Sequence, residues 1–417
     1  MKGNCLIAQS GGPTSAINAS LCGVYREMAE SPNVDKIFGG INGIQGVMLE
    51  KLLDLRPILH SEEQLRILTQ TPSSSLGSCR FKLKSPAERP EEYSRIFDVF
   101  EKYDIRYFIY IGGNDSMDTV FRLSEHAKSV NRDMRFMGVP KTIDNDLIGT
   151  DHTPGFGSCA KYISTSILEV AQDNMVYDMD SVVVVETMGR DAGWIAISAA
   201  LARDGYNNPL CDLIYTPETP FRSDKFIEDL QSVRRKKKQS VVVVSEGVKD
   251  EHGVYISETG ETDPFGHAML RGAGAVLADL IRRQLGIKVR PIELSLLQRC
   301  AAHCTSATDL RESAELGRLA ASSALEGLTG KMAALRRLSD DPYRTEYYFA
   351  DISEVANMVK TVPDEYFNEA RNHASNLALS YLKPLIAGSN EIIIHNETPV
   401  YLNLASIYEK ERAGFSV

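Results

Sequence analysis

Short apolar runs alternate with longer amphipathic stretches along most of the chain. The runs are apolar at almost every position rather than at every second one, as expected of strands buried on both faces of a parallel sheet. They span residues 5–9, 107–111, 134–139, 182–185, 213–216, 241–244 and 292–297. Each run therefore predicts one strand.

Between these runs lie stretches with the pattern of amphipathic helices. They span residues 15–29, 117–130, 159–172, 191–203, 224–238, 268–285 and 309–328. The alternation of strand and helix predicts parallel sheets with helices on both faces. Breaks are expected near residues 154–155 and 297–302, and the part after residue 342 is predicted to be mainly helical.

Length and charge indicate how many domains the chain can form and which classes of partner they exclude. The chain has 417 residues, enough for two ordinary domains. Its formal net charge of −10 argues against a nucleic-acid partner, because phosphate backbones select basic surfaces. No apolar run approaches the roughly 20 residues that span a bilayer. Seven cysteines without regular spacing, and no secretory pattern at the start, indicate a cytoplasmic protein with reduced thiols.

Two glycine loops follow predicted strands and precede predicted helices. In the first, Gly11 and Gly12 let backbone N–H groups approach an anion at a helix N-terminus, although a tight turn explains them equally well. The second, residues 112–116, adds Asp115 and Ser116. A carboxylate beside phosphates is useful when Mg²⁺ or a lysine lies between them. The alternative is that Asp115 only caps the following helix.

The third loop, residues 140–146, has the strongest chemical signal. It places Lys141, Asp144 and Asp146 directly after the strand predicted at 134–139. Either aspartate is suited to accept a proton, and Lys141 with Arg190 is suited to neutralise a transferring phosphoryl group. The alternative is a turn rich in aspartate and asparagine caps. Together the loops indicate a site for a phosphorylated substrate.

Three other motifs carry less weight. Residues 155–160 match G-x-G-x-x-A, but no clear strand precedes them, as a dinucleotide site requires. No G-x-x-x-x-G-K-[ST] loop occurs, which argues against a P-loop ATPase. Residues 300–304, Cys-Ala-Ala-His-Cys, lack the further ligands of a zinc site.

Taken together, the loops resemble the phosphofructokinase family, and in particular its pyrophosphate-dependent branch. The resemblance runs in order over about residues 4–330. The matching positions are Gly11-Gly12, residues 112–116, residues 140–146, residues 149–151 with Thr153, Gly155 and Phe156, residues 187–190, residues 245–247, Arg290 and Arg299.

The resemblance implies a role for each position that matches. Asp144 would be the base for the 1-hydroxyl of fructose 6-phosphate, with Asp146 supporting the site beside it. Thr142 and Arg190 would contact the transferring phosphoryl group, and Lys141 would also hold the pyrophosphate. The remaining positions on the donor side are Gly11, Gly12, Arg80, Asp115 and Ser116.

On the sugar side, the resemblance implies a pocket lined by Met188, Gly189 and Glu246. Arg299 would grip the 6-phosphate, and Arg290 would reach it from a neighbouring subunit. Leu296, Ser181 and the Cys-Ala pair after Arg299 differ from the usual residues around this phosphate. Sedoheptulose 7-phosphate is therefore a reasonable additional acceptor.

Donor choice depends on two positions. ATP-using relatives have glycine where this chain has Asp115 and Lys141, and an aspartate and a lysine would fill the space and can pair across it. The resemblance therefore implies a small donor, pyrophosphate. Asn114 stands where the family has a Mg²⁺-binding aspartate, so it retains the oxygen but loses the charge.

These observations predict two Rossmann-like three-layer α/β sandwich domains with mainly parallel sheets. Residues 1–155 with about 298–340 would form the donor domain, residues 156–297 the sugar-phosphate domain, and residues 341–417 a mainly helical extension. The expected reaction is reversible, Mg²⁺-dependent transfer from diphosphate to fructose 6-phosphate, in a homodimer or higher homo-oligomer with shared active sites. The alternatives are an ATP-dependent phosphofructokinase and a catalytically silent, sugar-phosphate-binding regulatory subunit.

Overall fold

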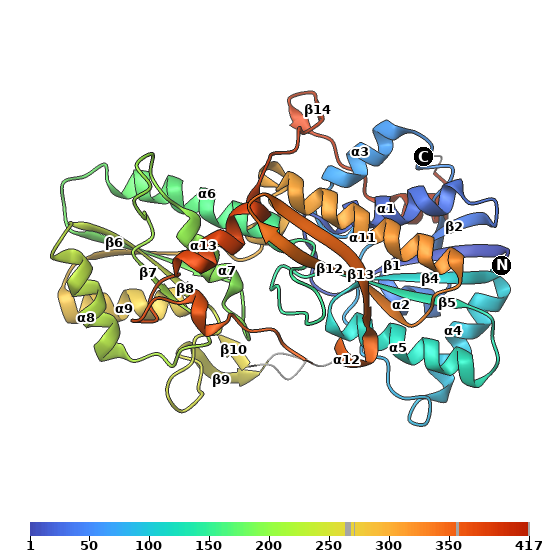
Figure 1. The fold of residues 1–417 in the computed structure, drawn as a ribbon, viewed down its shortest axis with the longest axis horizontal. Helices are drawn as coiled ribbons and strands as arrows, with labels where there is room; N and C mark the ends of the chain where they lie inside the picture. Colours follow the sequence, from blue (N-terminus) through green and yellow to red (C-terminus); the bar gives the residue numbers. More distant parts are fainter. Residues whose placement is uncertain (263–267, 271, 356–357, 416–417) are drawn as a thin grey trace.

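Two separate sheets, each covered by helices on both faces, form the two lobes of the molecule (Figure 1). The computed structural model describes residues 1–262, 268–270, 272–355 and 358–415. Among the helices in these ranges, none combines the length and apolar character needed to cross a membrane.

The larger sheet has seven strands in the order β13-β12-β5-β4-β1-β2-β3. The strands β2, β1, β4, β5 and β12 run parallel, whereas β3 and β13 are antiparallel edge strands. Their bounds are β1 (Gly3–Gln9), β2 (Val34–Gly40), β3 (Leu52–Asp54), β4 (Ile105–Gly112), β5 (Arg135–Pro140), β12 (Lys331–Asp340) and β13 (Tyr343–Asp351).

Helices cover both faces of this sheet because its strands present apolar side chains to each side. Ile7 and Ile109 belong to the core under α1 and α11, whereas Leu6 and Phe108 belong to the core under α4 and α5. The helices of this lobe are α1 (Ile17–Glu30), α2 (Gly43–Met48), α3 (Glu62–Gln70), α4 (Pro90–Lys102), α5 (Asn114–Ser129) and α11 (Ala307–Glu326).

The smaller lobe contains a four-stranded parallel sheet in the order β11-β6-β8-β7. Its strands are β6 (Ser181–Thr187), β7 (Leu213–Tyr215), β8 (Gln239–Ser245) and β11 (Lys288–Glu293). The remaining elements here are α6 (Phe156–Asn174), α7 (Trp194–Ser198), η1 (Ala199–Leu201), α8 (Ser223–Arg234), β9 (Glu258–Thr262), β10 (Ala268–Leu270), α9 (Ala273–Leu285), α10 (Leu297–Cys300) and η2 (Ala302–Cys304).

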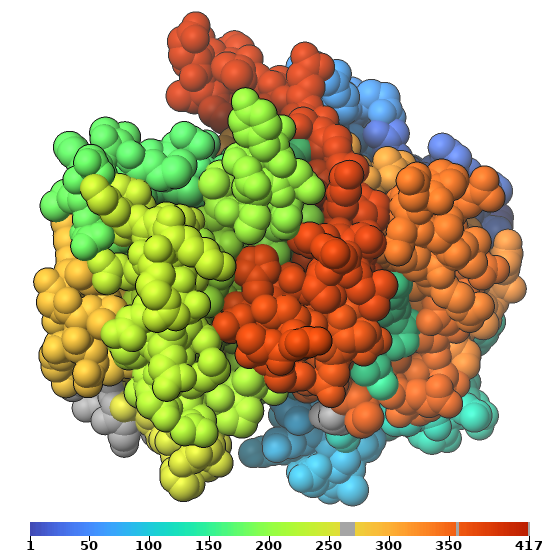
Figure 2. Space-filling model, turned by 60° about the vertical axis from the view of Figure 1, so that its left-hand side comes forward, coloured from blue at the N-terminus to red at the C-terminus, as the bar shows by residue number. Residues whose placement is uncertain are grey.

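The C-terminal part links the two lobes. Tyr381 and Leu385 share a core with Phe156 and Trp194 of the smaller lobe, whereas Leu404 packs into the core of the larger sheet. Figure 2 shows this segment, coloured red, between the yellow-green and orange parts of the surface. Its elements are α12 (Ile352–Val355), η3 (Asp364–Tyr366), α13 (Asn376–Leu382), η4 (Lys383–Ile386), β14 (Ile394–His395), β15 (Thr398–Pro399) and α14 (Leu404–Arg412).

The strands predicted within 5–9, 107–111, 134–139, 182–185, 213–216 and 241–244 are confirmed apart from single residues at their ends. The strand predicted at 292–297 is wrong beyond Glu293, because β11 runs from Lys288 to Glu293 and Ser295 takes a left-handed φ of 43°. The helix predicted at 268–285 begins only at Ala273, after β10, and residue 271 of the prediction lies outside the described residues.

The boundary predicted at residue 341 also needs correction. It separates β12 from β13, yet the two strands pair from Lys331 with Asp351 to Asp340 with Tyr343. The start of the supposed helical extension is therefore an edge strand of the larger sheet. Its residues form a strand because β12 presents an open edge, which β13 satisfies by antiparallel hydrogen bonding.

Candidate active site

Loops from both lobes enclose a cavity of about 350 Å³. It is lined by Gly12, Pro13, Arg80, Thr142, Ile143, Asp144, Asp146, Met188, Arg190, Asp191, Ala192, Glu246 and Arg299. The parallel strands β1, β5, β6 and β8 direct their carboxyl ends to this region, as open α/β sheets do at their ligand sites. Most of the predicted site residues are thus brought together from distant parts of the chain.

The loop after β5 presents its two aspartates to the cavity. Between them, Asn145 has a left-handed φ of 54° and is fully buried. Its side chain accepts a hydrogen bond from Thr153 N at 3.1 Å and donates one to the Tyr381 hydroxyl at 3.2 Å. Asn145 therefore anchors the loop from behind, a role that sequence reasoning missed.

Both aspartates have raised pKa values. Burial raises the pKa of Asp144, the Glu246 charge adds to this, and a hydrogen bond from the Thr142 hydroxyl at 3.3 Å opposes it. Burial and the Asp144 charge together raise the pKa of Asp146 to about 6. A carboxylate whose pKa lies this close to neutrality is suited to accept a proton.

Lys141 lies directly beneath the first glycine loop, with only 1% of its surface exposed. Its ammonium donates a hydrogen bond to Gly12 O, and a Cβ at Gly11 would lie 3.3 Å from Lys141 Nζ. Burial lowers the pKa of Lys141 to about 7, although the charges of Asp144 and Asp146 oppose this effect. An arriving phosphate would stabilise the charged form.

The pairing of Asp115 with Lys141 that the sequence allows is not formed in this structure. Among the described residues Lys141 forms no ion pair with Asp115, which is exposed. The reason is that the Lys141 ammonium turns towards Gly12 instead. Ser116 is placed to support the loops, because its hydroxyl donates to Ser10 Oγ at 3.0 Å.

The loop after β6 brings Arg190 to the opposite wall of the cavity. Arg190 Nε lies 3.7 Å from Glu246 Oε1, which follows β8. Gly189 has a φ of 116°, and a Cβ there would come within 2.6 Å of Ala192 O, so this position requires glycine. Gly189 thus shapes the loop without lining the cavity. The neighbouring Asp191 does line it and was not predicted from sequence.

Arginines supply most of the positive charge of the cavity. Arg80 and Arg299 line it together with Arg190, and Arg299 Nη1 lies 3.8 Å from where a Cβ of Gly12 would stand. Guanidinium groups bind phosphate oxygens in a bidentate manner. The cavity therefore has cationic groups for more than one phosphate.

Arg290 does not reach the cavity of its own chain. It lies on β11, where its side chain is 58% exposed and donates to Asp173 Oδ2 at 3.2 Å. With Ser181 it lines a separate hollow on the surface of the smaller lobe. Its place is compatible with a role in a neighbouring subunit.

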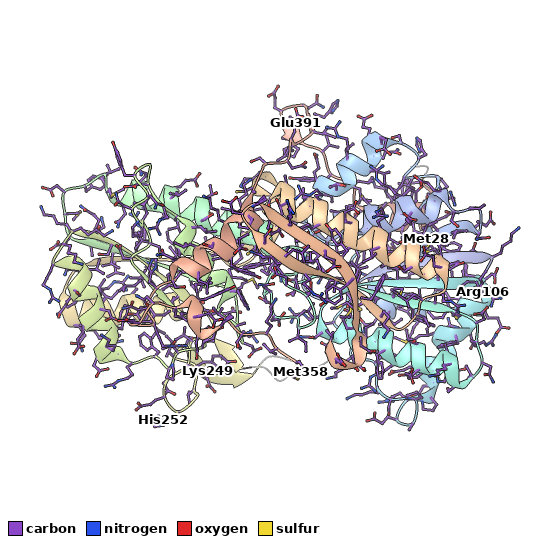
Figure 3. All side chains as sticks on the ribbon, viewed as in Figure 1. Met28, Arg106, Lys249, His252, Met358 and Glu391 are labelled. Atoms are coloured by element: carbon purple, nitrogen blue, oxygen red, sulfur yellow. The ribbon has the colours of Figure 1, made fainter. Side chains whose placement is uncertain are left out.

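Asn114, at the start of α5, offers an oxygen for a metal ion. Its Oδ1 is buried and has no hydrogen-bond partner among the described residues. Its Nδ2 donates to Met358 O at 3.4 Å, and Figure 3 shows Met358 at the junction of the two lobes. Within the described ranges no three His, Cys, Asp or Glu side chains gather at one metal site. A Mg²⁺ ion held mainly by substrate phosphates and water fits this arrangement, because it prefers oxygen ligands.

Comparisons with known proteins find similar chains and a similar fold. The family model described as Phosphofructokinase matches residues 4–322. The pyrophosphate–fructose 6-phosphate 1-phosphotransferases of Methylococcus capsulatus and Halomonas elongata are both 39% identical, covering 99% and 96% of this chain and the same shares of their own. The crystal structure of a pyrophosphate-dependent phosphofructokinase from Nitrosospira multiformis is similar with a TM-score of 0.87 at 35% identity, over 97% of this chain and 96% of that one.

Proposed function

Because this chain belongs to the phosphofructokinase family, we propose that it is a pyrophosphate-dependent 6-phosphofructokinase. It transfers a phosphoryl group from diphosphate to the 1-hydroxyl of fructose 6-phosphate, giving fructose 1,6-bisphosphate and orthophosphate. The observation that carries the proposal is the shared cavity in which Asp144 and Arg190, from two loops, meet Arg299 of helix α10. Near-full-length relatives with this activity support it.

In the forward reaction, Asp144 accepts the proton of the sugar 1-hydroxyl. The sugar oxygen then forms a bond to one phosphorus of diphosphate, and the bond from that phosphorus to the bridging oxygen breaks. Orthophosphate leaves with the electron pair of that bond. Arg190 and the protonated Lys141 neutralise charge on the phosphoryl oxygens, and Thr142 orients the Asp144 carboxylate at 3.3 Å.

The residues also fit a divalent metal, which we propose to be Mg²⁺. Asn114 Oδ1, which has no hydrogen-bond partner among the described residues, is one protein oxygen that could hold it, with Asp115 next in sequence, and diphosphate oxygens would provide most of its ligands. When bound, the metal would supply further neutralisation of the diphosphate charge. The similarity to pyrophosphate-dependent relatives implies that the reaction is readily reversible.

The fold supports the binding of the two substrates by different lobes. We propose that the donor domain comprises residues 1–155 and about 298–340, extended to 351 by β13, and that residues 156–297 form the sugar-phosphate domain. Diphosphate would lie near Gly11, Gly12 and Arg80, and the 6-phosphate near Arg299. Met188 and Glu246 would contact the sugar.

The proposal includes a homo-oligomer in the cytoplasm. Arg290 lines a separate surface hollow and not the cavity of its own chain, so it would complete the sugar-phosphate site of a neighbouring copy. All seven cysteines are unpaired, in agreement with a reducing compartment.

The test is a coupled assay of fructose 1,6-bisphosphate formation with Mg²⁺, comparing diphosphate and ATP at equal concentration. Turnover with diphosphate alone is expected. Turnover with ATP alone would keep the family and reject the donor. No turnover with either donor would favour the regulatory subunit or another acceptor, of which sedoheptulose 7-phosphate is the first to try.

A further inference from the structure

The loop that carries Asp144 and Asp146 is held from the C-terminal segment by one lysine. The Lys360 ammonium donates hydrogen bonds to Asp151 O at 2.7 Å, Thr150 O at 3.2 Å and Asn145 Oδ1 at 3.3 Å. The Lys360 backbone N–H donates to Asp146 O at 2.7 Å. Lys360 therefore contacts the C-terminal end of the loop, at Asn145 and Asp146, and the chain that follows it at Thr150 and Asp151.

The same residue is fixed on its other side by the smaller lobe. Trp194 Nε1 donates to Lys360 O at 2.8 Å, and the ammonium lies 5.4 Å from the centre of the Trp194 ring. Two residues further on, Val362 N donates to Glu218 Oε1 at 3.0 Å, an oxygen that also accepts from Gly193 N at 2.8 Å. Lys360 thus connects the aspartate loop to the loop that follows Arg190.

The charge of Lys360 also acts on the site. It counteracts the effects of burial and of the Asp144 charge, which raise the pKa of Asp146. The other charged groups that face Asp146 are Asp191 and Lys141. Lys360 itself is faced by Asp151 and Arg337. Without its ammonium, Asp146 would have fewer positive charges to balance it.

We propose that Lys360 is a positioning residue, which holds the aspartate loop in its reactive geometry. The expected effect on the reaction rests on the proposed function. The attachment of the aspartate loop to Lys360, called the tether below, rests on the hydrogen bonds alone. Lys360 does not line the cavity itself and touches its wall only at the backbone of Asp146, so its effect on the reaction is indirect.

The central test replaces Lys360 by Met, which keeps a long unbranched stem without the ammonium. Lys360→Gln keeps a hydrogen-bond donor without the charge and serves if the Met variant folds poorly, and Lys360→Arg keeps the charge. The matched control is Lys383→Met on the same segment, because Lys383 is exposed and its side chain forms no hydrogen bond or ion pair to the described residues.

Hydrogen exchange by mass spectrometry tests the tether without any need for activity. Peptides over residues 140–155 contain the Thr142 N–H, bonded to Pro154 O, and the Thr153 N–H, bonded to Asn145 Oδ1. In Lys360→Met these peptides should exchange at least about tenfold faster, whereas Lys383→Met should match the wild type. Exchange unchanged from the wild type in both Lys360→Met and Lys360→Gln would overturn the proposal.

Kinetics test the effect on the site. In Lys360→Met and Lys360→Gln, kcat should fall at least about tenfold with a much smaller change in KM for fructose 6-phosphate. When kcat is measured against pH, the acidic limb of the profile should move to higher pH, because a lost positive charge raises the pKa of the neighbouring carboxyls. Lys360→Arg should restore the position of this limb. An acidic limb that stays at the wild-type pH in both neutral variants would overturn the electrostatic role of Lys360.

If the wild type itself transfers no phosphoryl group, the proposed function fails. The hydrogen-exchange result then still decides whether Lys360 holds the aspartate loop.

Discussion

Replacing Lys141 by Met should stabilise the free protein while it removes activity. Lys141 is almost fully buried, and burial lowers its pKa from 10.5 to about 7 in the folded state. The folded protein therefore disfavours the charged form that the unfolded chain carries at neutral pH. Met has a similar length and fills the same space without a charge to desolvate.

The size of the effect follows from linkage between protonation and folding. The unfolded chain binds the Lys141 proton more tightly than the folded protein does, so the penalty on folding is absent above pH 10.5. It grows as the pH falls towards 7 and is constant below that. The full penalty corresponds to about 5 kcal/mol. Losing the charged hydrogen bond to Gly12 O offsets about 1.5 to 3 kcal/mol.

We therefore expect Lys141→Met to raise the free energy of unfolding by about 2 kcal/mol near pH 6. This advantage should shrink by about 3 kcal/mol by pH 9, where the wild-type penalty is smaller. The assay is urea unfolding followed by the fluorescence of Trp194, the single tryptophan, at several pH values and without substrates. Lys383→Met serves as the exposed control. A variant less stable than the wild type at pH 6, or an advantage independent of pH, would refute the reasoning.

Three further predictions concern the reaction. Asp144→Ser should lower kcat about a thousandfold or more with little change in KM for fructose 6-phosphate, because the base is lost and the sugar contacts remain; a variant within tenfold of the wild type would remove Asp144 from this role. Arg299→Met should instead raise KM for fructose 6-phosphate by more than about tenfold, since a charged hydrogen bond contributes about 1.5 to 3 kcal/mol, and steady-state kinetics with an unchanged KM would exclude it from the 6-phosphate site. If Arg290 acts in a neighbouring subunit, inactive Arg290→Met and Asp144→Ser chains should regain activity when they are co-expressed and assemble together, whereas no recovery in mixed oligomers would place Arg290 outside the shared site.

The parts of the site that sequence predicted well are local in the chain. A buried strand followed at once by glycines or acids marks a loop at the carboxyl edge of a sheet, which is how residues 140–146 and 187–190 were placed. The signal lies within a few residues, so no knowledge of the tertiary structure is needed.

The parts that were missed depend on contacts between distant segments. Residues 331–338, Lys-Met-Ala-Ala-Leu-Arg-Arg-Leu, are good helix formers, yet they form β12 because β5 and β13 offer hydrogen-bonding edges on either side. Lys360 reaches Asn145 from 215 residues away, and no motif surrounds it. Lys141 was expected to face Asp115, but only the packed structure shows its ammonium beneath Gly12.

The most direct measurement follows labelled phosphorus from the donor into the sugar. The protein is incubated with Mg²⁺, fructose 6-phosphate and ³²P-labelled diphosphate, and the products are separated. The account predicts label at the 1-phosphate of fructose 1,6-bisphosphate, with an equal amount of orthophosphate released and no such transfer in Asp144→Ser. Diphosphate hydrolysis without label in the sugar, or labelling of the sugar only from γ-labelled ATP, would contradict it.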